Sequence, residues 1–451
     1  MPTNTNYAPS FSADIENYIA EKVLPLTQRQ LVAYQFGDKA NLPPGRGTTY
    51  TASRYSRISL PFAPLAEGVP SVGESLQLSQ VTATAQQWGD LVEITDVGEL
   101  TIKHDLFKQA ITATARQVAE TLERNTFNNL MTGTNVIFAN GKTSRAALGS
   151  TDVLSPTEIN KAEGSMLTTG VPMFDAPGVD NDDMKLDAGK SGKAARSHYV
   201  SILHPLPRQD LMSNSTIVNA FSYSAIDRLY NNELGEWGGF RFTHSNMVPT
   251  FTGAAAVAGT AVGTGGAFGA ATYYIQVTGV NKITGYEEVV YQVSAGIAVV
   301  ADGSITLTTP SDSTHYYNVY VGTSASTIGN LALSAQGPTS GTMSGQAVLI
   351  PSNTSVTLTN VGAARTPPAP PATGVTVYPT FWIGMGAYTQ VSLDNTKFFY
   401  LREADKSDPQ NQLRIVSWKV FYGTLINNQA FLLRTESGSA YVNAITNGTL
   451  S

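Results

Sequence analysis

Residues 103–131 read KHDLFKQAITATARQVAETLERNTFNNLM, and this stretch decides how the rest of the chain is interpreted. Apolar side chains recur in it every three or four residues, which places them on one face of a helix. They are Phe107, Ile111, Ala115, Val118 and Leu122. Gly133 follows the pattern and can end the helix. A helix of this length spans about 43 Å, which is long for a globular domain, so the sequence predicts a structural spine.

The residues before this helix, 49–95, predict a long two-stranded β-ribbon. The outgoing leg, 48–60, is rich in Thr, Tyr and Ser, and the return leg runs from Leu76 through Trp88 to Ile94. A ribbon of two strands has too little core to be stable alone. We therefore expect it to lie on the body of its own chain or on a neighbouring subunit.

Shorter elements are predicted on both sides of the ribbon and helix. Before them lies an arm over 1–48, with a helix at 12–24. After them come a buried strand at 199–203 ended by His204-Pro205, a helix near 225–232, a turn and strand at 235–244, and two strands at 418–426 and 430–434. The strand at 418–426 is too continuously apolar to be an edge strand.

The composition changes abruptly between residues 253 and 371. Residues 253–271 are almost entirely Gly, Ala, Val and Thr, and residues 366–371 read TPPAPP, so both predict linkers. Between them, short strands alternate inward and outward, which predicts a small β-sandwich hung from one surface loop of the body. The expected inward-facing residues are Tyr273, Ile275, Val277, Ile305, Leu307, Tyr317, Val319, Val321, Val356 and Leu358.

Composition excludes several classes of protein. Charged residues make up only 14% of the 451 residues, against about 25% in an ordinary domain. This scarcity indicates either a surface hidden in contacts with other copies or a β-rich surface of Thr, Ser and Gly. The absence of Cys excludes disulfides and thiolate chemistry, and a net charge of -6 provides no basic footprint for nucleic acid. No signal peptide or membrane span is predicted.

No motif predicts catalysis, a cofactor or a metal. Gly189-Lys190-Ser191 lacks the earlier glycine of a phosphate-binding loop, and the acidic loop at 175–184 lacks the glycine and distal glutamate of a calcium loop. None of the five histidines lies in a zinc-protease pattern, and no nucleophile elbow occurs. We therefore expect no enzymatic activity and no cofactor.

The order of these parts resembles the major capsid proteins of tailed bacteriophages, which have the α+β Hong Kong 97-type fold, and within them the N4-type phage branch. The match covers about 10–250 and 376–440. The residues that carry it are His204-Pro205, the block 235–242 with 245–249, and the late blocks 377–380, 384–388 and 408–420. The sandwich separately resembles fibronectin type III or immunoglobulin-like modules, through 273–281, 285–288 and 317–323.

The resemblance implies a division of the chain. It gives an N-terminal arm (1–48), an extended β-ribbon loop (49–95), a peripheral domain with the spine helix (96–200), an axial domain (201–250 and 376–400), an inserted sandwich with linkers (251–375), and peripheral strands with a C-terminal tail (401–451). The inserted sandwich is expected on the outer face of a shell.

The resemblance also implies function and partners. The chain would be a coat protein that self-assembles, as pentamers and hexamers, into an icosahedral head around double-stranded DNA without sequence-specific contacts. A separate scaffolding protein is expected because only about 48 residues precede the ribbon. A portal and a decoration protein are further expected partners, no membrane is involved, and assembly would take place in the host bacterial cytoplasm to give the capsid of the virion.

Contacts between subunits are expected along the ribbon. The candidates are Tyr50, Arg54, Arg57, Ile58, Leu60, Phe62, Leu65, Glu67 and Trp88. On the spine helix, basic residues including Arg116 and Arg124 are offset by Glu120 and Glu123. For these we favour salt bridges within or between subunits over contact with packaged DNA.

Two other functions compete with this interpretation. A surface adhesin or tail-fibre protein would use the sandwich for binding, but it would need neither the ribbon nor the long helix. A bacterial nanocompartment shell would share the fold, but as a rule it lacks an inserted sandwich. No residues in the sequence support an enzymatic function.

Overall fold

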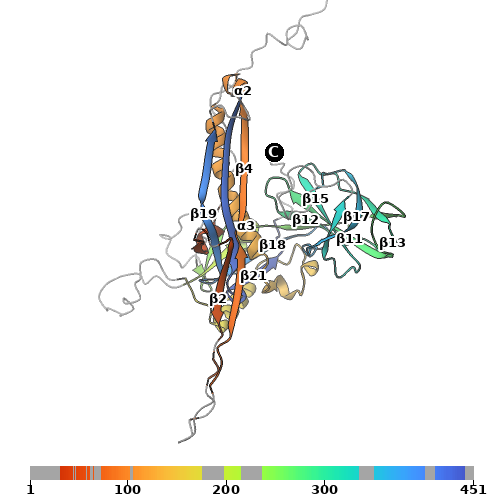
Figure 1. Ribbon diagram of the computed structural model, residues 1–451. Helices are drawn as coiled ribbons and strands as arrows, with labels where there is room; N and C mark the ends of the chain where they lie inside the picture. The colour runs from red at the N-terminus through yellow and green to blue at the C-terminus, as the bar shows by residue number, and fades with distance from the viewer. Residues whose placement is uncertain are drawn as a thin grey trace, which may run out of the picture.

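The computed structural model describes residues 31–43, 45, 47–56, 58–60, 64, 73–101, 105–174, 198–214, 236–334, 350–401 and 412–441. The predicted helices at 12–24 and 225–232, the acidic loop and the Gly-Lys-Ser sequence lie outside these residues. The described chain is mixed α and β, with a long sheet-and-helix body and a β-rich insert to one side (Figure 1).

The predicted spine helix is confirmed as α3 (Leu106–Leu130). It begins at Asp105, whose side chain accepts a hydrogen bond of 2.9 Å from the backbone N–H of Lys108. The helix lies along a four-stranded sheet, and its axis is aligned with the long strands of that sheet (Figure 1). The order of that sheet is β1 (Asp38–Asn41), β19 (Tyr388–Leu401), β20 (Leu413–Ile426) and β4 (Gln86–Thr95), and α2 (Asp96–Thr101) connects β4 toward the helix.

Alternation along β20 explains how helix and sheet pack. Its buried residues Val416, Trp418, Val420 and Tyr422 follow a period of two, so one face of the strand lies against α3. β20 lies between β19 and β4, as its apolar sequence predicted.

The buried face of the helix agrees only in part with the expected one. Ala115 is exposed, and Thr114 is buried in its place. The hydroxyl of Thr114 donates to the carbonyl of Ala110 at 2.8 Å, one turn earlier. Threonine can therefore enter this core because its polar group is satisfied within the helix.

A second sheet of the body is centred on β18 (Thr376–Ile383). It is flanked by β6 (Tyr199–Leu203) and β21 (Leu432–Ser437), which pair onward with β8 (Phe240–His244) and β5 (Val136–Phe138), and β8 pairs with β7 (Glu236–Trp237). All five residues of β6 are buried, as predicted for a strand covered on both faces. The helices of this region are α1 (Ala33–Phe36), α4 (Pro156–Thr169) and α5 (Pro205–Ser213), with short 3-10 turns η1 (Ala139–Gly141), η2 (Arg145–Ala147) and η4 (Gln429–Phe431).

Residues 255–371, called the insert, have a core of their own. All ten residues expected to face inward lie in one buried cluster, together with Phe268. Its strands are β10 (Gly259–Val262), β11 (Ala271–Asn281), β12 (Glu287–Tyr291), β13 (Ile297–Val299), β14 (Ser304–Thr308), β15 (His315–Gly322), β16 (Asn330–Ser334) and β17 (Ser355–Ala364). The first part of β17 pairs with β14 and its last part with β16, so the sheet folds back over the core. The likeness to fibronectin type III or immunoglobulin modules stays a prediction.

The insert does not hang from flexible linkers, which differs from the expectation. The first expected linker contains strand β10, which pairs with β14, and the buried Phe268. In the second, the carbonyl of Pro368 accepts a hydrogen bond of 3.1 Å from Gln276 on β11. β12 also pairs with β9 (Phe251–Ala254), which pairs with β18, so one sheet runs from insert into body. Segments rich in small residues or in proline resemble linkers in sequence, but both segments here pack against the rest of the chain.

The ribbon is shorter than predicted. β2 (Thr49–Tyr55) pairs with β3 (Leu78–Thr84), but the return leg then turns at the buried Ala85 and becomes β4 of the four-stranded sheet. Gly423 on β20 allows this close approach, because a Cβ there would lie 2.8 Å from the carbonyl oxygen of Thr84. The second late strand also starts later than predicted, at Leu432, and belongs to a different sheet from β20.

Candidate inter-subunit surface

The ribbon carries apolar side chains that its own chain leaves exposed. β2 and β3 form a separate two-stranded sheet, which projects from the end of the body opposite α2 (Figure 1). We define the ribbon patch as Tyr55, Ile58, Leu60, Leu76 and Leu78, with exposed fractions of 66%, 57%, 83%, 61% and 51%. Large apolar side chains gathered in this way mark contact surfaces.

Polar contacts hold the two legs of the ribbon together near this patch. The backbone N–H of Ser59 donates to the Glu74 carboxylate at 3.1 Å, and the Ser59 hydroxyl bonds to the same carboxylate. Farther back, the Gln80 amide donates to the Ser53 hydroxyl at 3.3 Å. The patch is therefore presented on a cross-bridged hairpin.

The predicted contact residues that the structure describes differ in their exposure and position. Ile58, Leu60 and Arg54 are exposed on the ribbon. Tyr50 is half-buried at the ribbon's root against its own chain, and Trp88 lies in β4 beside the core under α3. Arg57, Phe62, Leu65 and Glu67 lie outside the described residues. The inter-subunit role of all nine stays a prediction.

Sequence reasoning missed three residues of the ribbon patch: Tyr55, Leu76 and Leu78. A usable signal was present, because Leu76 and Leu78 are two residues apart and so share a face in an extended chain.

A second exposed apolar surface lies at the α2 end of the body. We define the distal patch as Val97, Leu100, Phe398, Phe399, Tyr400 and Leu413, with exposed fractions from 36% to 86%. β1 pairs only with residues 389–392 of β19, so no described strand covers the outer edge of β19 at 397–401. An exposed strand edge with aromatic side chains is a ready surface for contact with another chain. The run Phe398-Phe399-Tyr400 was the overlooked signal.

A buried ionic cluster fixes the body to the insert. Arg145 donates twice to the Glu436 carboxylate, at 2.7 Å from Nε and 2.5 Å from Nη2, and Arg434 donates to it at 3.1 Å. Arg145 also donates to the carbonyl of Ala369 in the insert at 3.1 Å and lies over the Phe251 ring at 4.1 Å. Burial alone would raise the pKa of Glu436, but the two guanidinium groups outweigh it and hold that pKa below its ordinary value.

Glu123 has an unexpected place in the structure. It was expected to offset basic residues of the spine helix in salt bridges, but it is fully buried. Its carboxylate accepts hydrogen bonds from the backbone N–H groups of Val32, Ala33 and Tyr34 at 2.7, 2.7 and 2.9 Å. Burial raises the pKa of Glu123, and the three backbone hydrogen bonds oppose that rise. The helix therefore anchors the chain at the point where the N-terminal arm enters the body.

Within the described ranges, no group of three or more His, Asp or Glu side chains is arranged to hold a metal ion. None of the described helices is long and apolar enough to cross a membrane.

Comparison with known proteins gives a structural likeness. No family model and no curated protein sequence matches the chain. Among solved structures, the capsid structure of cyanophage P-SCSP1u is 11% identical with a TM-score of 0.51, and the alignment covers 97% of both chains. The cyanophage Pam1 capsid is 10% identical with a TM-score of 0.52 and covers 95% of this chain and 98% of that one. Together with the spine helix, the ribbon and the long sheet, this likeness shows that the chain has the Hong Kong 97-type fold of phage capsid proteins.

Proposed function

We propose that this chain is a major capsid protein that self-assembles into an icosahedral phage head around double-stranded DNA. The observation that carries the proposal is the ribbon patch, which projects from a capsid fold and has five large apolar side chains exposed. Burial of apolar surface contributes about 25 cal/mol per Å², so covering this patch with a neighbouring copy would favour assembly. Many such contacts, repeated by symmetry, close a shell.

The division of the chain follows from this role. The peripheral domain is assigned to 96–200 and 401–451 and the axial domain to 201–250 and 376–400, with the arm at 1–48. The structure supports limiting the free ribbon to residues 49–84, because β4 belongs to the long sheet. We place the insert on the outer face of the shell.

The proposed partners are other copies in pentamers and hexamers, a separate scaffolding protein, a portal and a decoration protein. Assembly would take place in the host cytoplasm, and the finished protein would lie in the virion capsid. The role is structural rather than enzymatic, with no cofactor and no membrane contact.

The test is a deletion restricted to the ribbon tip. Residues 57–76 are replaced by a short Gly-Ser turn, which leaves β4 and the core residues beside Trp88 in place. We expect a monomer with unchanged circular dichroism and thermal midpoint. Negative-stain electron microscopy, with a candidate scaffolding protein co-expressed, should show closed shells for the parent chain and none for the deletion.

A matched control is Ile283→Ser, which removes an apolar side chain that is 80% exposed on the insert. This variant should assemble like the parent. Normal shells from the ribbon deletion would refute the proposed role of the ribbon patch.

A further inference from the structure

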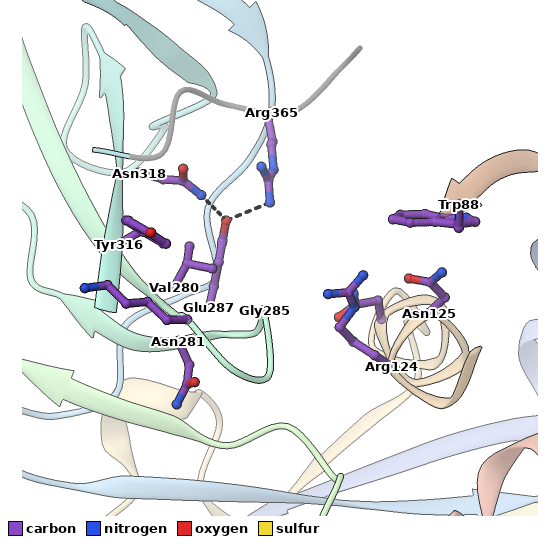
Figure 2. Close-up of a pocket in the computed structure, with 12 residues that line it drawn as sticks. Trp88, Arg124, Asn125, Val280, Asn281, Gly285, Glu287, Tyr316, Asn318 and Arg365 are labelled. Carbon is purple, nitrogen blue, oxygen red and sulfur yellow. Dashed lines mark hydrogen bonds and ion pairs between the residues drawn. The ribbon is translucent and has the colours of Figure 1, made fainter. Parts of the chain in front are cut away.

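A cleft of about 300 Å³ lies where the insert meets the body (Figure 2). Ligand sites occur preferentially at such junctions between structural units. On the body side, the cleft is lined by Trp88 of β4 and by Arg124 and Asn125 of α3. On the insert side, it is lined by Glu287, Asn318 and Arg365. Figure 2 shows these two groups facing each other across an open space.

The acid on the insert side is already neutralised. One oxygen of Glu287 accepts hydrogen bonds from Arg365 Nη2 at 2.6 Å, Asn318 Nδ2 at 2.7 Å and the Tyr320 hydroxyl at 2.8 Å. The Arg365 side chain is still 43% exposed, so its remaining N–H groups are available to solvent or a ligand.

The body side carries a positive charge with no acidic partner among the described residues. The Arg124 guanidinium lies over the Trp88 ring at 5.6 Å and packs against Gly285, where a Cβ would lie 2.5 Å from its Nη1. Burial lowers the pKa of Arg124, while Tyr286 acts to raise it. Next to it, the buried Nδ2 of Asn125 has no hydrogen-bond acceptor in the described part of the chain. Buried charges and donors of this kind are costly unless they are paired.

We propose that this cleft binds a small oxyanion, a phosphate or a carboxylate, between Arg124 and Arg365. A guanidinium presents two parallel N–H groups that match the oxygens of either group, and the Asn125 amide adds a further donor. The volume lies at the lower limit of ligand pockets, which suits a single phosphate or an acidic side chain. This inference goes beyond the coat function and does not depend on it.

The first experiment is a calorimetric titration of the unassembled 451-residue chain with inorganic phosphate, at an ionic strength held constant with sodium chloride. We expect one phosphate bound per chain. Arg124→Gln should weaken binding about tenfold or more, because a charged hydrogen bond contributes about 1.5–3 kcal/mol. Arg365→Gln should weaken binding as well.

Arg116→Gln is the matched control, since it removes the same charge from the same helix two turns earlier, outside the cleft. It should bind phosphate like the parent. Asn125→Asp is a second variant, which places a carboxylate beside Arg124 and should abolish binding without removing the arginine. The proposal would be overturned if the parent chain did not bind phosphate. It would also be overturned if Arg124→Gln and Asn125→Asp bound phosphate as tightly as the parent chain.

The same titration of assembled shells distinguishes the two sources of the oxyanion. One phosphate per subunit in shells would identify a free oxyanion as the ligand. Binding that is present in the unassembled chain and lost in shells would identify an acidic side chain of a neighbouring copy. Because the first titration uses unassembled protein, its failure leaves the proposed coat function untouched.

Discussion

At the scale of single residues, His204 joins two elements of the body. It ends the buried strand β6, and its Nδ1 accepts a hydrogen bond of 3.3 Å from the backbone N–H of Leu206 in the first turn of α5. Burial lowers the pKa of His204 from 6.5 to about 4. A protonated Nδ1 would also be unable to accept this hydrogen bond. The imidazole is therefore held neutral in the folded chain.

This predicts a pH dependence of stability. Between pH 6.5 and 4 the unfolded imidazole binds a proton and the folded one does not, so the free energy of unfolding falls as the pH is lowered, by up to about 3 kcal/mol. His204→Asn keeps a helix-capping oxygen but cannot titrate. Urea denaturation at several pH values should show a smaller loss of stability for the variant over this range. An identical loss would contradict the prediction.

The ionic cluster at Glu436 gives a second prediction at this scale. Arg145→Ala leaves the buried Glu436 with only Arg434 and frees the Ala369 carbonyl, so it should lower the free energy of unfolding by about 3–5 kcal/mol. The control is Lys142→Ala, which removes an ion pair of 3.9 Å with Asp152 from a side chain that is 39% exposed. It should cost less than about 1 kcal/mol. Both are measured by urea denaturation.

At the scale of elements, the turn between β11 and β12 docks the insert. Tyr286 of this turn is 4% exposed and lies in the core of the body with Phe127, Leu130 and Phe381. Gly285, with a φ of 69°, allows the turn to approach Arg124. The side chain and backbone amide of Asn281 and the carboxylate of Glu288 hold the turn in shape.

Tyr286→Ala should therefore loosen the insert without unfolding its own core. Losing a buried aromatic ring costs about 3–5 kcal/mol, here from the contact between insert and body. Hydrogen exchange should become faster in β9 and in the turn at 281–287, and stay slow in β11 and β15. Ile283→Ala is the matched control, because that side chain is in the same turn and 80% exposed. Equal exchange in the two variants would show that the turn does not dock the insert.

At the scale of the whole molecule, the insert begins and ends at neighbouring points. Thr252 pairs with Thr376, and Gly253 forms a bridge with Thr373. Replacing residues 255–371 with a two-residue turn should therefore leave a folded body. Its thermal midpoint should fall by several degrees, because Tyr286 and the bond from Arg145 to Ala369 are lost.

The same excision tests how the molecule is divided. The separate segment 255–371 should fold alone, with a near-ultraviolet circular dichroism signal, because its core contacts are its own. The body without its insert should still form shells, visible by electron microscopy, since its ribbon is intact. An unfolded body would show that insert and body are a single folding unit.

The sequence by itself determined the elements whose pattern is local. The apolar repeat from Phe107 to Leu122 specified the spine helix, and alternation specified the strands of the insert, because one periodic face is enough to define an element. The buried face of the helix was predicted less accurately, since Thr114 is buried where Ala115 was expected. Ile58 and Leu60, which were expected to form inter-subunit contacts on the ribbon, are exposed, whereas Tyr55 and the distal patch were not predicted.

Only the tertiary structure decided which segments lie together. The ribbon ends at Thr84 because β20 takes up the rest of the return leg, and no local pattern specifies that pairing. Glu123 is buried because three N–H groups from residues about 90 positions earlier surround it. The glycine-rich and proline-rich segments are packed because Tyr286, Arg145 and the shared sheet hold the insert against the body. Burial and hydrogen bonding between distant residues are properties of the folded chain, so they are invisible to periodicity and composition.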